Sequence, residues 1–150
     1  FIKELVPRTA IALVARKFYN ENYVDVPMST RIEQTGGTVK SVTYSWQLNG
    51  GENYLKLETQ GEALPLAEGS VQEFITEHYW GYARQRDGGT VEYKVEHPRW
   101  RVWESRSAEL HADVTALYGQ EFGEILSRPP ASAFLAEGSP VSVFSGVRIG

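Results

Sequence analysis

The chain has no cysteine and a single methionine, Met28, among its 150 residues. Without cysteine it can form no disulfide and can use no thiol as a nucleophile or metal ligand. This absence fits the reducing cytoplasm, which is the location that we expect. Long apolar runs are also missing, since the longest, residues 9–15, is far shorter than the roughly 20 residues that cross a bilayer. The sequence therefore predicts no membrane partner.

Basic residues are too few for general nucleic-acid binding, which needs cations to neutralise phosphates. The net charge is −4, with ten arginines and five lysines. Half of the arginines gather between positions 84 and 106, interleaved with glutamates. We expect most of them to lie on solvated strand faces, with anion binding by one or two as the alternative.

The length and composition predict one domain. Hydrophobic residues make up 41% of the chain and charged residues 23%, which is ordinary for a globular protein. No repeat, low-complexity tract or linker divides residues 1–150. Because the chain starts at Phe1 in what reads as a strand already under way, we expect further residues upstream, so that 1–150 is a single domain lacking its N-terminal portion.

Helical periodicity is clear in three places. Apolar residues recur at helical spacing within 8–19, and 113–127 has helical character up to the Pro129–Pro130 pair. Ser70 and Glu73 form a capping box, which predicts a short helix beginning there.

Period-two alternation and turn signals predict eight or nine strands. The Asn49-Gly50-Gly51 and Asp87-Gly88-Gly89 sequences are hairpin turns. We also predict a final hairpin from strands 132–136 and 141–149, with its turn at 137–140. The expected fold is α+β: a mainly antiparallel, barrel-like sheet with about three short helices.

The stretch 74–82 concentrates reactive side chains, and within it we predict Glu77 and His78 as catalytic acid–base residues. Both types are readily tuned for proton transfer near neutral pH. His78 falls on the apolar stripe of its helix, whereas Glu77 lies about 100° around it. The alternative is a buried His78 bonded to backbone or a tyrosine, and a Glu77 paired with an arginine.

Charged residues around the first helix and several aromatic residues are candidates for ligand binding. A helix-end arginine aimed into a cavity can hold a carboxylate with two hydrogen bonds, although its ordinary role is on the helix surface. Tyrosine and tryptophan line pockets as well as cores, and we expect Tyr44 and Trp46 to face Trp80 and Tyr82. The predicted ligand-binding residues are Arg8, Arg16, Glu21, Tyr44, Trp46, Tyr79 and Tyr82. No nucleotide-binding glycine pattern or metal-ligand spacing is present, so the sequence predicts no cofactor and no metal.

Several separated blocks resemble the YqjF-like family, a group of uncharacterised bacterial proteins related in fold to acetoacetate decarboxylase. They are Phe1-Ile-Lys-Glu-Leu-Val-Pro-Arg8, Ile11, Val14-Ala-Arg16, Tyr23, Pro27-Met28, Phe74-Ile-Thr-Glu-His-Tyr-Trp-Gly-Tyr82, Val95-Glu-His-Pro-Arg-Trp100 and Ser132-Ala-Phe-Leu-Ala-Glu-Gly-Ser139. The resemblance covers essentially the whole chain. It implies a cone-like antiparallel barrel whose interior holds a small organic molecule.

One departure from that fold's decarboxylases bears on the chemistry. Those enzymes use a pair of adjacent lysines after a proline, one of which forms an imine with the substrate. Here the five lysines are never adjacent, and the equivalent stretch reads Val26-Pro27-Met28-Ser29. The resemblance therefore implies that this chain has the ligand cavity of those decarboxylases but lacks their nucleophilic lysine.

Two functions remain open from the sequence. The first is an enzyme that uses Glu77 as general acid or base on a small organic acid or carbonyl compound, with His78 or Tyr82 orienting it. The second is a non-catalytic domain that binds or senses a metabolite. Either has a small organic ligand as its partner, and a homo-oligomer is open in both. An interior filled solid by Trp46, Trp80 and Trp103 would exclude both functions and leave a structural or interaction role.

Overall fold

The largest unit of the molecule is a five-stranded antiparallel sheet with strand order β3-β4-β5-β8-β9. A computed structural model describes residues 3–150; Phe1 and Ile2, where the opening strand is predicted to begin, lie outside the described residues. Asn49 and Gly50 both have positive φ, 51° and 78°, as a tight hairpin turn requires, and they join β4 to β5 as predicted. The strands are β3 (Met28–Thr35), β4 (Thr38–Leu48), β5 (Gly51–Leu64), β8 (Val102–His111) and β9 (Phe134–Ala136).

A second antiparallel sheet is centred on β7. Strand β6 pairs with one edge of β7, and the two short strands β10 and β11 pair with the other. The strands are β6 (Trp80–Arg84), β7 (Thr90–Glu96), β10 (Ser142–Val143) and β11 (Val147–Arg148).

The predicted final hairpin is wrong. Strand β9 pairs with β8, whereas β10 and β11 pair with β7, so the segment between them crosses from one sheet to the other. Two contacts hold the crossing segment beside the start of β8: the Glu137 N–H donates to the Arg101 carbonyl (3.0 Å), and the Trp100 indole N–H donates to Ser139 Oγ (2.9 Å). The chain therefore continues past β8 instead of turning back.

The first predicted helix forms over Thr9–Tyr19, in two parts. Helix α1 (Thr9–Val14) runs directly into η1 (Ala15–Tyr19), a wider π-helical turn that ends at Asn20 with a left-handed φ of 54°. The helix lies between β1 (Glu4–Val6) and β2 (Tyr23–Asp25), which pair in parallel. Ala12 is buried, but three residues of the predicted apolar stripe, Ile11, Val14 and Phe18, are exposed, and Ala15 is half-buried.

The remaining helices are α2 (Val71–Thr76), α3 (Val114–Tyr118) and α4 (Gln120–Leu126). The N-cap of α2 is confirmed, because Ser70 Oγ accepts a hydrogen bond from the Glu73 N–H (3.1 Å). The reciprocal bond of the predicted capping box is shifted by one residue, since the Glu73 carboxylate accepts from the Gly69 N–H (2.7 Å). The single helix predicted over 113–127 is divided at Gly119, whose φ of 87° is outside the helical range. Residues 3–150 consequently hold four α-helices in place of the three expected.

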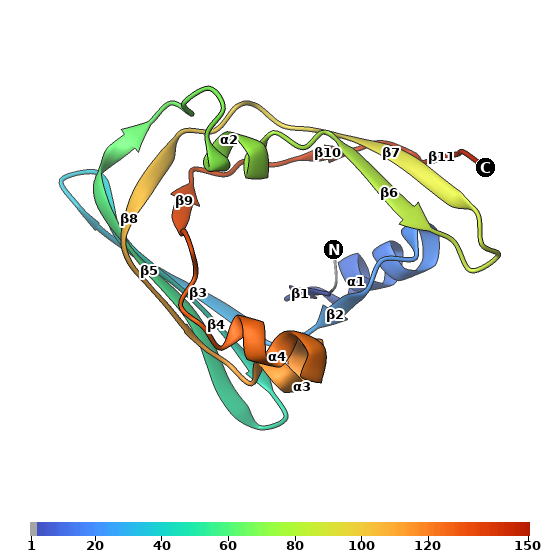
Figure 1. The fold of residues 1–150 in the computed structure, drawn as a ribbon, viewed down its shortest axis with the longest axis horizontal. Coiled ribbons are helices and arrows are strands. Elements are labelled where there is room, and N and C mark those ends of the chain that lie inside the picture. Colours follow the sequence, from blue (N-terminus) through green and yellow to red (C-terminus); the bar gives the residue numbers. More distant parts are fainter. Residues whose placement is uncertain (1–2) are drawn as a thin grey trace.

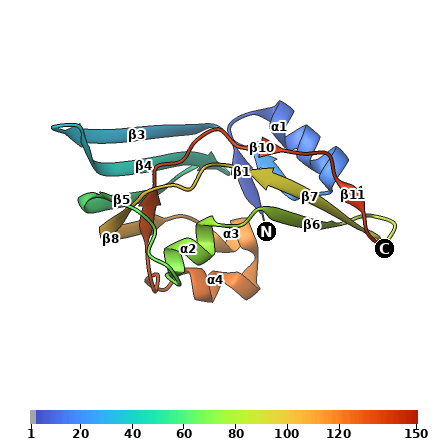
Figure 2. The ribbon, with the colours of Figure 1, turned by 90° about the horizontal axis from the view of Figure 1, so that it is seen from above.

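The mainly antiparallel α+β architecture is as predicted, but the barrel is not closed by backbone hydrogen bonds. Within residues 3–150, the strands fall into the five-stranded sheet, the sheet around β7 and the β1–β2 pair. Figure 1 shows the five-stranded sheet on one side and β6, β7 and α1 on the other, with α2 and the α3–α4 pair at opposite positions between them. Figure 2 shows α1 on the opposite side of the molecule from α2, α3 and α4.

A small core lies where β2, β4 and α3 meet. Its buried members are Val26, Trp46 and Leu117, and partly buried side chains from β1, β3 and α3 pack around them. No helix within residues 3–150 has the length and apolar character that crossing a bilayer requires.

Candidate functional site

The inner face of the five-stranded sheet carries the two aromatic residues that the sequence places on one strand face. Tyr44 and Trp46 are two residues apart on β4 and therefore point to the same side. Tyr44 is paired with Leu55 of β5, which is paired in turn with Leu110 of β8. Trp46 is buried, at 8% exposure, whereas Tyr44 is 39% exposed.

These side chains line an apolar cavity of about 480 Å³, which we call the sheet cavity. Helices α3 and α4 form its opposite wall, and β1 and the start of β3 close one end. The lining residues are Leu5, Met28, Tyr44, Trp46, Leu55, Leu110, Ala112, Val114, Leu117, Tyr118, Phe122 and Leu126. Polar groups are few: two tyrosine hydroxyls and one indole.

The wall that carries Trp46 is fixed by a buried amide. Asn53, on β5 opposite Trp46, donates through Nδ2 to the Trp46 carbonyl (3.5 Å) and accepts through Oδ1 from the Asp113 N–H (3.0 Å). Asn53 thereby joins the sheet to the start of α3. The Trp46 indole N–H is itself buried and has no acceptor among the described residues. Such a group costs about 1–3 kcal/mol, and a buried water would relieve that cost.

The apolar surface continues along the sheet into a second cavity of about 610 Å³. The two cavities share Leu55, Leu110 and Leu126. From there the second extends past Ala108 and Phe134 to Ile75 of α2, under the 128–133 segment. The two cavities together form one elongated apolar groove between the sheet and the helices.

Glu77 lies just after α2, whose Ile75 lines the second cavity, but Glu77 itself lines neither cavity. Its Oε2 accepts a hydrogen bond from the Tyr79 hydroxyl (2.5 Å), while Oε1 is buried without a donor among the described residues. This hydrogen bond raises the pKa of Tyr79. The Tyr79 ring lies 4.9 Å from His97, which stacks on Trp100 at 4.0 Å. Glu77 and Tyr79, both predicted site residues, are thus brought together.

His78 and Tyr82 are not part of this arrangement. His78 is exposed, its Nδ1 lies 3.1 Å from the Ile75 carbonyl, and its ring meets Phe74 edge-on at 5.3 Å. Of the alternative interpretation of His78, the backbone contact is present, but the burial is wrong, because the apolar stripe of α2 is itself exposed. Tyr82 is 59% exposed on β6, and a hydrogen bond to Glu92 raises its pKa.

The expected wall of four aromatic residues does not form. Trp80 and Tyr82 belong to the sheet around β7, whereas Tyr44 and Trp46 belong to the five-stranded sheet, and neither Trp80 nor Tyr82 lines the sheet cavity. Alternation along one strand predicts which side chains share a face, but it carries no information on which sheet lies opposite.

The charged candidates lie around the first helix, away from the sheet cavity. Arg8 is exposed just before α1. Arg16 donates through Nε to the Ala12 carbonyl (3.2 Å) and pairs with Asp25 (3.3 Å). Glu21 accepts a hydrogen bond from the Tyr93 hydroxyl (3.1 Å).

Glu21 belongs to a group of phenols and carboxylates that sequence reasoning missed. Burial, followed by the charge of Glu21, raises the pKa of Tyr93 to about 12. Burial and a hydrogen bond to Glu4 likewise raise the pKa of Tyr23. A sequence signal for Tyr93 exists: Gly81 lies directly opposite it on β6, and a glycine across from an aromatic residue leaves room for the ring.

The chain belongs to the family DUF2071, described as an uncharacterized conserved protein, whose match covers residues 1–140. This membership agrees with the resemblance to YqjF-like proteins. No curated protein and no solved structure matches the chain.

Proposed function

We propose that this protein binds a small, largely apolar organic molecule in the sheet cavity. The observation that carries the proposal is the cavity itself, about 480 Å³ of space with an almost entirely apolar lining and two tyrosine hydroxyls. Small-molecule sites have this size, this apolar character and a few placed polar groups. Binding of such a molecule, unlike its chemical conversion, requires no reactive side chain in addition to this lining.

The lining narrows the class of ligand. An apolar body would lie between Leu55 and Leu110 of the sheet and Phe122 of α4, and a hydrogen-bonding group would reach Tyr44 or Tyr118. Met28, in the stretch equivalent to the lysine pair of decarboxylases, is one of the lining residues, and none of the five lysines is. Imine formation with a bound carbonyl compound is therefore not part of the proposal.

We further propose that the sheets and helices enclose this ligand in the manner of a barrel, as in the fold of acetoacetate decarboxylase. The placement of α2 and α3–α4 between the two larger sheets supports this, although the sheets do not pair with each other. The absence of cysteine supports a cytoplasmic location, and the net charge of −4 supports a ligand other than nucleic acid.

Native mass spectrometry after incubation with a pooled metabolite extract tests the proposal. We expect a retained adduct of defined mass on the wild-type protein. Ala112→Phe places a ring inside the cavity and should abolish the adduct. Ala116→Phe makes the same change at an exposed position of α3 and should leave it intact. A folded wild-type protein with no adduct, or an adduct that survives Ala112→Phe, contradicts the proposal.

Catalysis by Glu77 is a second candidate function, favoured by the environment of its carboxylate. A carboxylate with one buried oxygen that lacks a donor, and a phenol bonded to the other, suits transfer of a proton to or from a bound molecule. The ligand would have to extend along the groove from the sheet cavity toward α2.

Turnover of the ligand identified by mass spectrometry separates the two functions. For an enzyme, Glu77→Gln should keep the adduct and stop its conversion, while Glu124→Gln, on the exposed side of α4, should leave the rate unchanged. If the ligand were unchanged after prolonged incubation with the wild-type protein, catalysis would be excluded and only the binding function would remain.

A further inference from the structure

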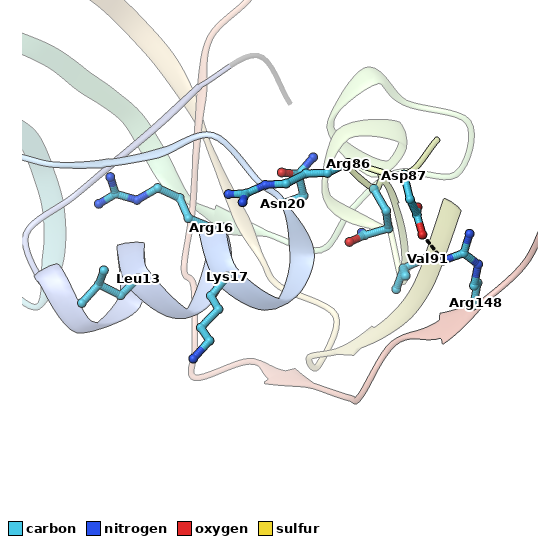
Figure 3. A pocket seen from close by; sticks show the side chains of 9 residues that line it. Leu13, Arg16, Lys17, Asn20, Arg86, Asp87, Val91 and Arg148 are labelled. Atoms are coloured by element: carbon cyan, nitrogen blue, oxygen red, sulfur yellow. Dashed lines mark hydrogen bonds and ion pairs between the residues drawn. The ribbon is translucent and has the colours of Figure 1, made fainter. Parts of the chain in front are cut away.

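A cleft with several charged side chains lies on the other side of the molecule, between the end of the first helix and the turn from β6 to β7. Its volume is about 570 Å³. Figure 3 draws its lining: Leu13, Arg16, Lys17, Asn20, Gln85, Arg86, Asp87, Val91 and Arg148. The side chains come from α1, η1 and the following Asn20, from the β6–β7 turn and β7, and from β11. We call this the basic cleft.

The charge of the basic cleft is opposite to that of the protein. Four cationic side chains line it against the single carboxylate of Asp87, in a chain with a net charge of −4. Arg148 pairs with Asp87 (2.6 Å) and holds the pKa of that carboxyl below its usual range. Arg16 pairs with Asp25, outside the cleft.

Two cations of the cleft have no carboxylate partner within residues 3–150. The Lys17 ammonium lies 5.6 Å from the ring centre of its neighbour Phe18, and Arg86 makes no ion pair. Both side chains are exposed, so water solvates their charges in the free protein. An anion that enters the cleft would meet two cations that are not already paired with a carboxylate.

The two walls of the cleft are joined to each other by side-chain amides. Asn20 donates through Nδ2 to the Arg84 carbonyl (2.7 Å), and Gln85 donates through Nε2 to the Tyr19 carbonyl (3.4 Å). Asn20 can make this contact because it has left-handed φ at the end of η1, and π-helical turns of this kind recur at functional sites. The cationic side chains therefore extend from a preorganised frame.

We propose that the basic cleft binds an extended organic anion with more than one charged group, such as a polyphosphate or a polycarboxylate. Figure 3 shows Arg16 and Lys17 leaving the helix in different directions, Arg86 reaching from the β6–β7 turn toward the helix end beside Asn20, and Arg148 beside Asp87 on the far side. Leu13 and Val91 provide an apolar surface for the body of the ligand. This proposal is independent of the sheet cavity.

Isothermal titration calorimetry at low ionic strength tests the inference, with tripolyphosphate, citrate and inorganic phosphate as probes. We expect saturable binding of tripolyphosphate, citrate or both, and weaker binding of inorganic phosphate; the stronger ligand tells phosphate from carboxylate recognition. The double variant Lys17→Gln/Arg86→Gln should weaken that binding at least about tenfold, since two charge-assisted contacts are lost.

The double variant Arg31→Gln/Lys40→Gln removes the same total charge from exposed positions of β3 and β4, and should change the affinity less than about threefold. An equal loss in the two double variants would mean that the protein attracts anions only through its overall field. That result, or failure of the wild-type protein to bind tripolyphosphate and citrate, overturns the inference.

Discussion

Gly81 and Tyr93 show how one missing side chain can fix the position of another. They lie opposite each other on β6 and β7, and the Tyr93 ring occupies the space above the glycine. A Cβ atom at Gly81 would lie 2.2 Å from Tyr93 Cζ and 2.5 Å from its hydroxyl oxygen. The ring could not stay in place, and its hydrogen bond to Glu21 would be lost with it.

We therefore expect Gly81→Ala to lower the free energy of unfolding by about 1–3 kcal/mol, the usual cost of overpacking. Urea denaturation measures the change. Gly51→Ala is the matched control, because a Cβ there would meet only the Leu48 carbonyl oxygen, at 3.4 Å. In a Tyr93→Ala background the substitution at Gly81 should lose most of its effect; additive losses would show that the ring is not the cause.

Residue-level predictions from the sequence succeeded where a single strand or a short loop decides the outcome. Tyr44 and Trp46 share a face because they are two residues apart. Glu77 and Tyr79, which the sequence named only as separate candidates, meet because they are close in the chain. The partnership of Glu21 with Tyr93 joins residues 72 apart, so no local periodicity indicates it. Contacts between residues that are far apart in the sequence depend on how the whole chain folds, and residue spacing does not predict them.

Helix α2 is the element whose stability depends most visibly on its first residues. It has six residues, too few for a stable isolated helix, and its apolar residues Val71, Phe74 and Ile75 are exposed. Ser70 caps its first turn. Glu73 accepts from the Gly69 N–H (2.7 Å) and pairs with Arg99, which anchors the helix to the segment before β8.

Loss of the cap should destabilise the protein. Ser70→Ala removes the acceptor for the Glu73 N–H, and we expect a decrease of about 1 kcal/mol in the free energy of unfolding. Ser70→Asp supplies another acceptor at the same place and should retain stability. Ser145→Ala, in an exposed loop, is the control for loss of a hydroxyl. If Ser70→Asp were as unstable as Ser70→Ala, capping would not be the explanation.

Elements were predictable from sequence when their signals were local. The first helix, the capped helix and the hairpins at Asn49–Gly50 and Asp87–Gly88 all follow from adjacent residues. The division of 113–127 at Gly119 depends on one backbone angle, which a glycine permits but does not require. The final strands failed for a different reason: β9, β10 and β11 are two or three residues long, and distant strands determine their pairing.

At the scale of the whole molecule, the sheet around β7 is joined to the first helix through a group of tyrosines and carboxylates, which we call the joint. Its members are Glu4, Tyr19, Glu21, Tyr23 and Tyr93. The Tyr19 and Tyr93 rings meet edge-to-face at 5.0 Å, and Tyr93 donates to Glu21. On the β1–β2 pair, Tyr23 is hydrogen-bonded to Glu4. These residues adjoin the basic cleft, since Asn20, which follows Tyr19 in the chain, is one of its lining residues.

This joint makes the stability of the fold sensitive to alkaline pH. A tyrosine in the unfolded chain loses its proton at about pH 10. In the folded protein, burial and the Glu21 carboxylate raise the pKa of Tyr93 to about 12, and the pKa of Tyr23 is raised by burial and Glu4. Between these values the folded state binds more protons than the unfolded state. Stability from these phenols is therefore complete below about pH 10 and is lost as the pH rises toward about 12.

Tyr93→Phe isolates this effect from the titration of other groups. The variant lacks the hydrogen bond to Glu21, so we expect it to be less stable than the wild type at neutral pH. Because its ring has no proton to lose, its free energy of unfolding should fall less between about pH 9 and about pH 11. Urea denaturation at the two pH values measures both quantities, and Tyr44→Phe, on the other sheet, gives the effect of deleting an unrelated hydroxyl. If the free energy of unfolding fell equally in Tyr93→Phe and the wild type between the two pH values, the contacts of Tyr93 would not depend on its hydroxyl proton, and the prediction would be contradicted. The acid and phenol would then be held together by packing alone.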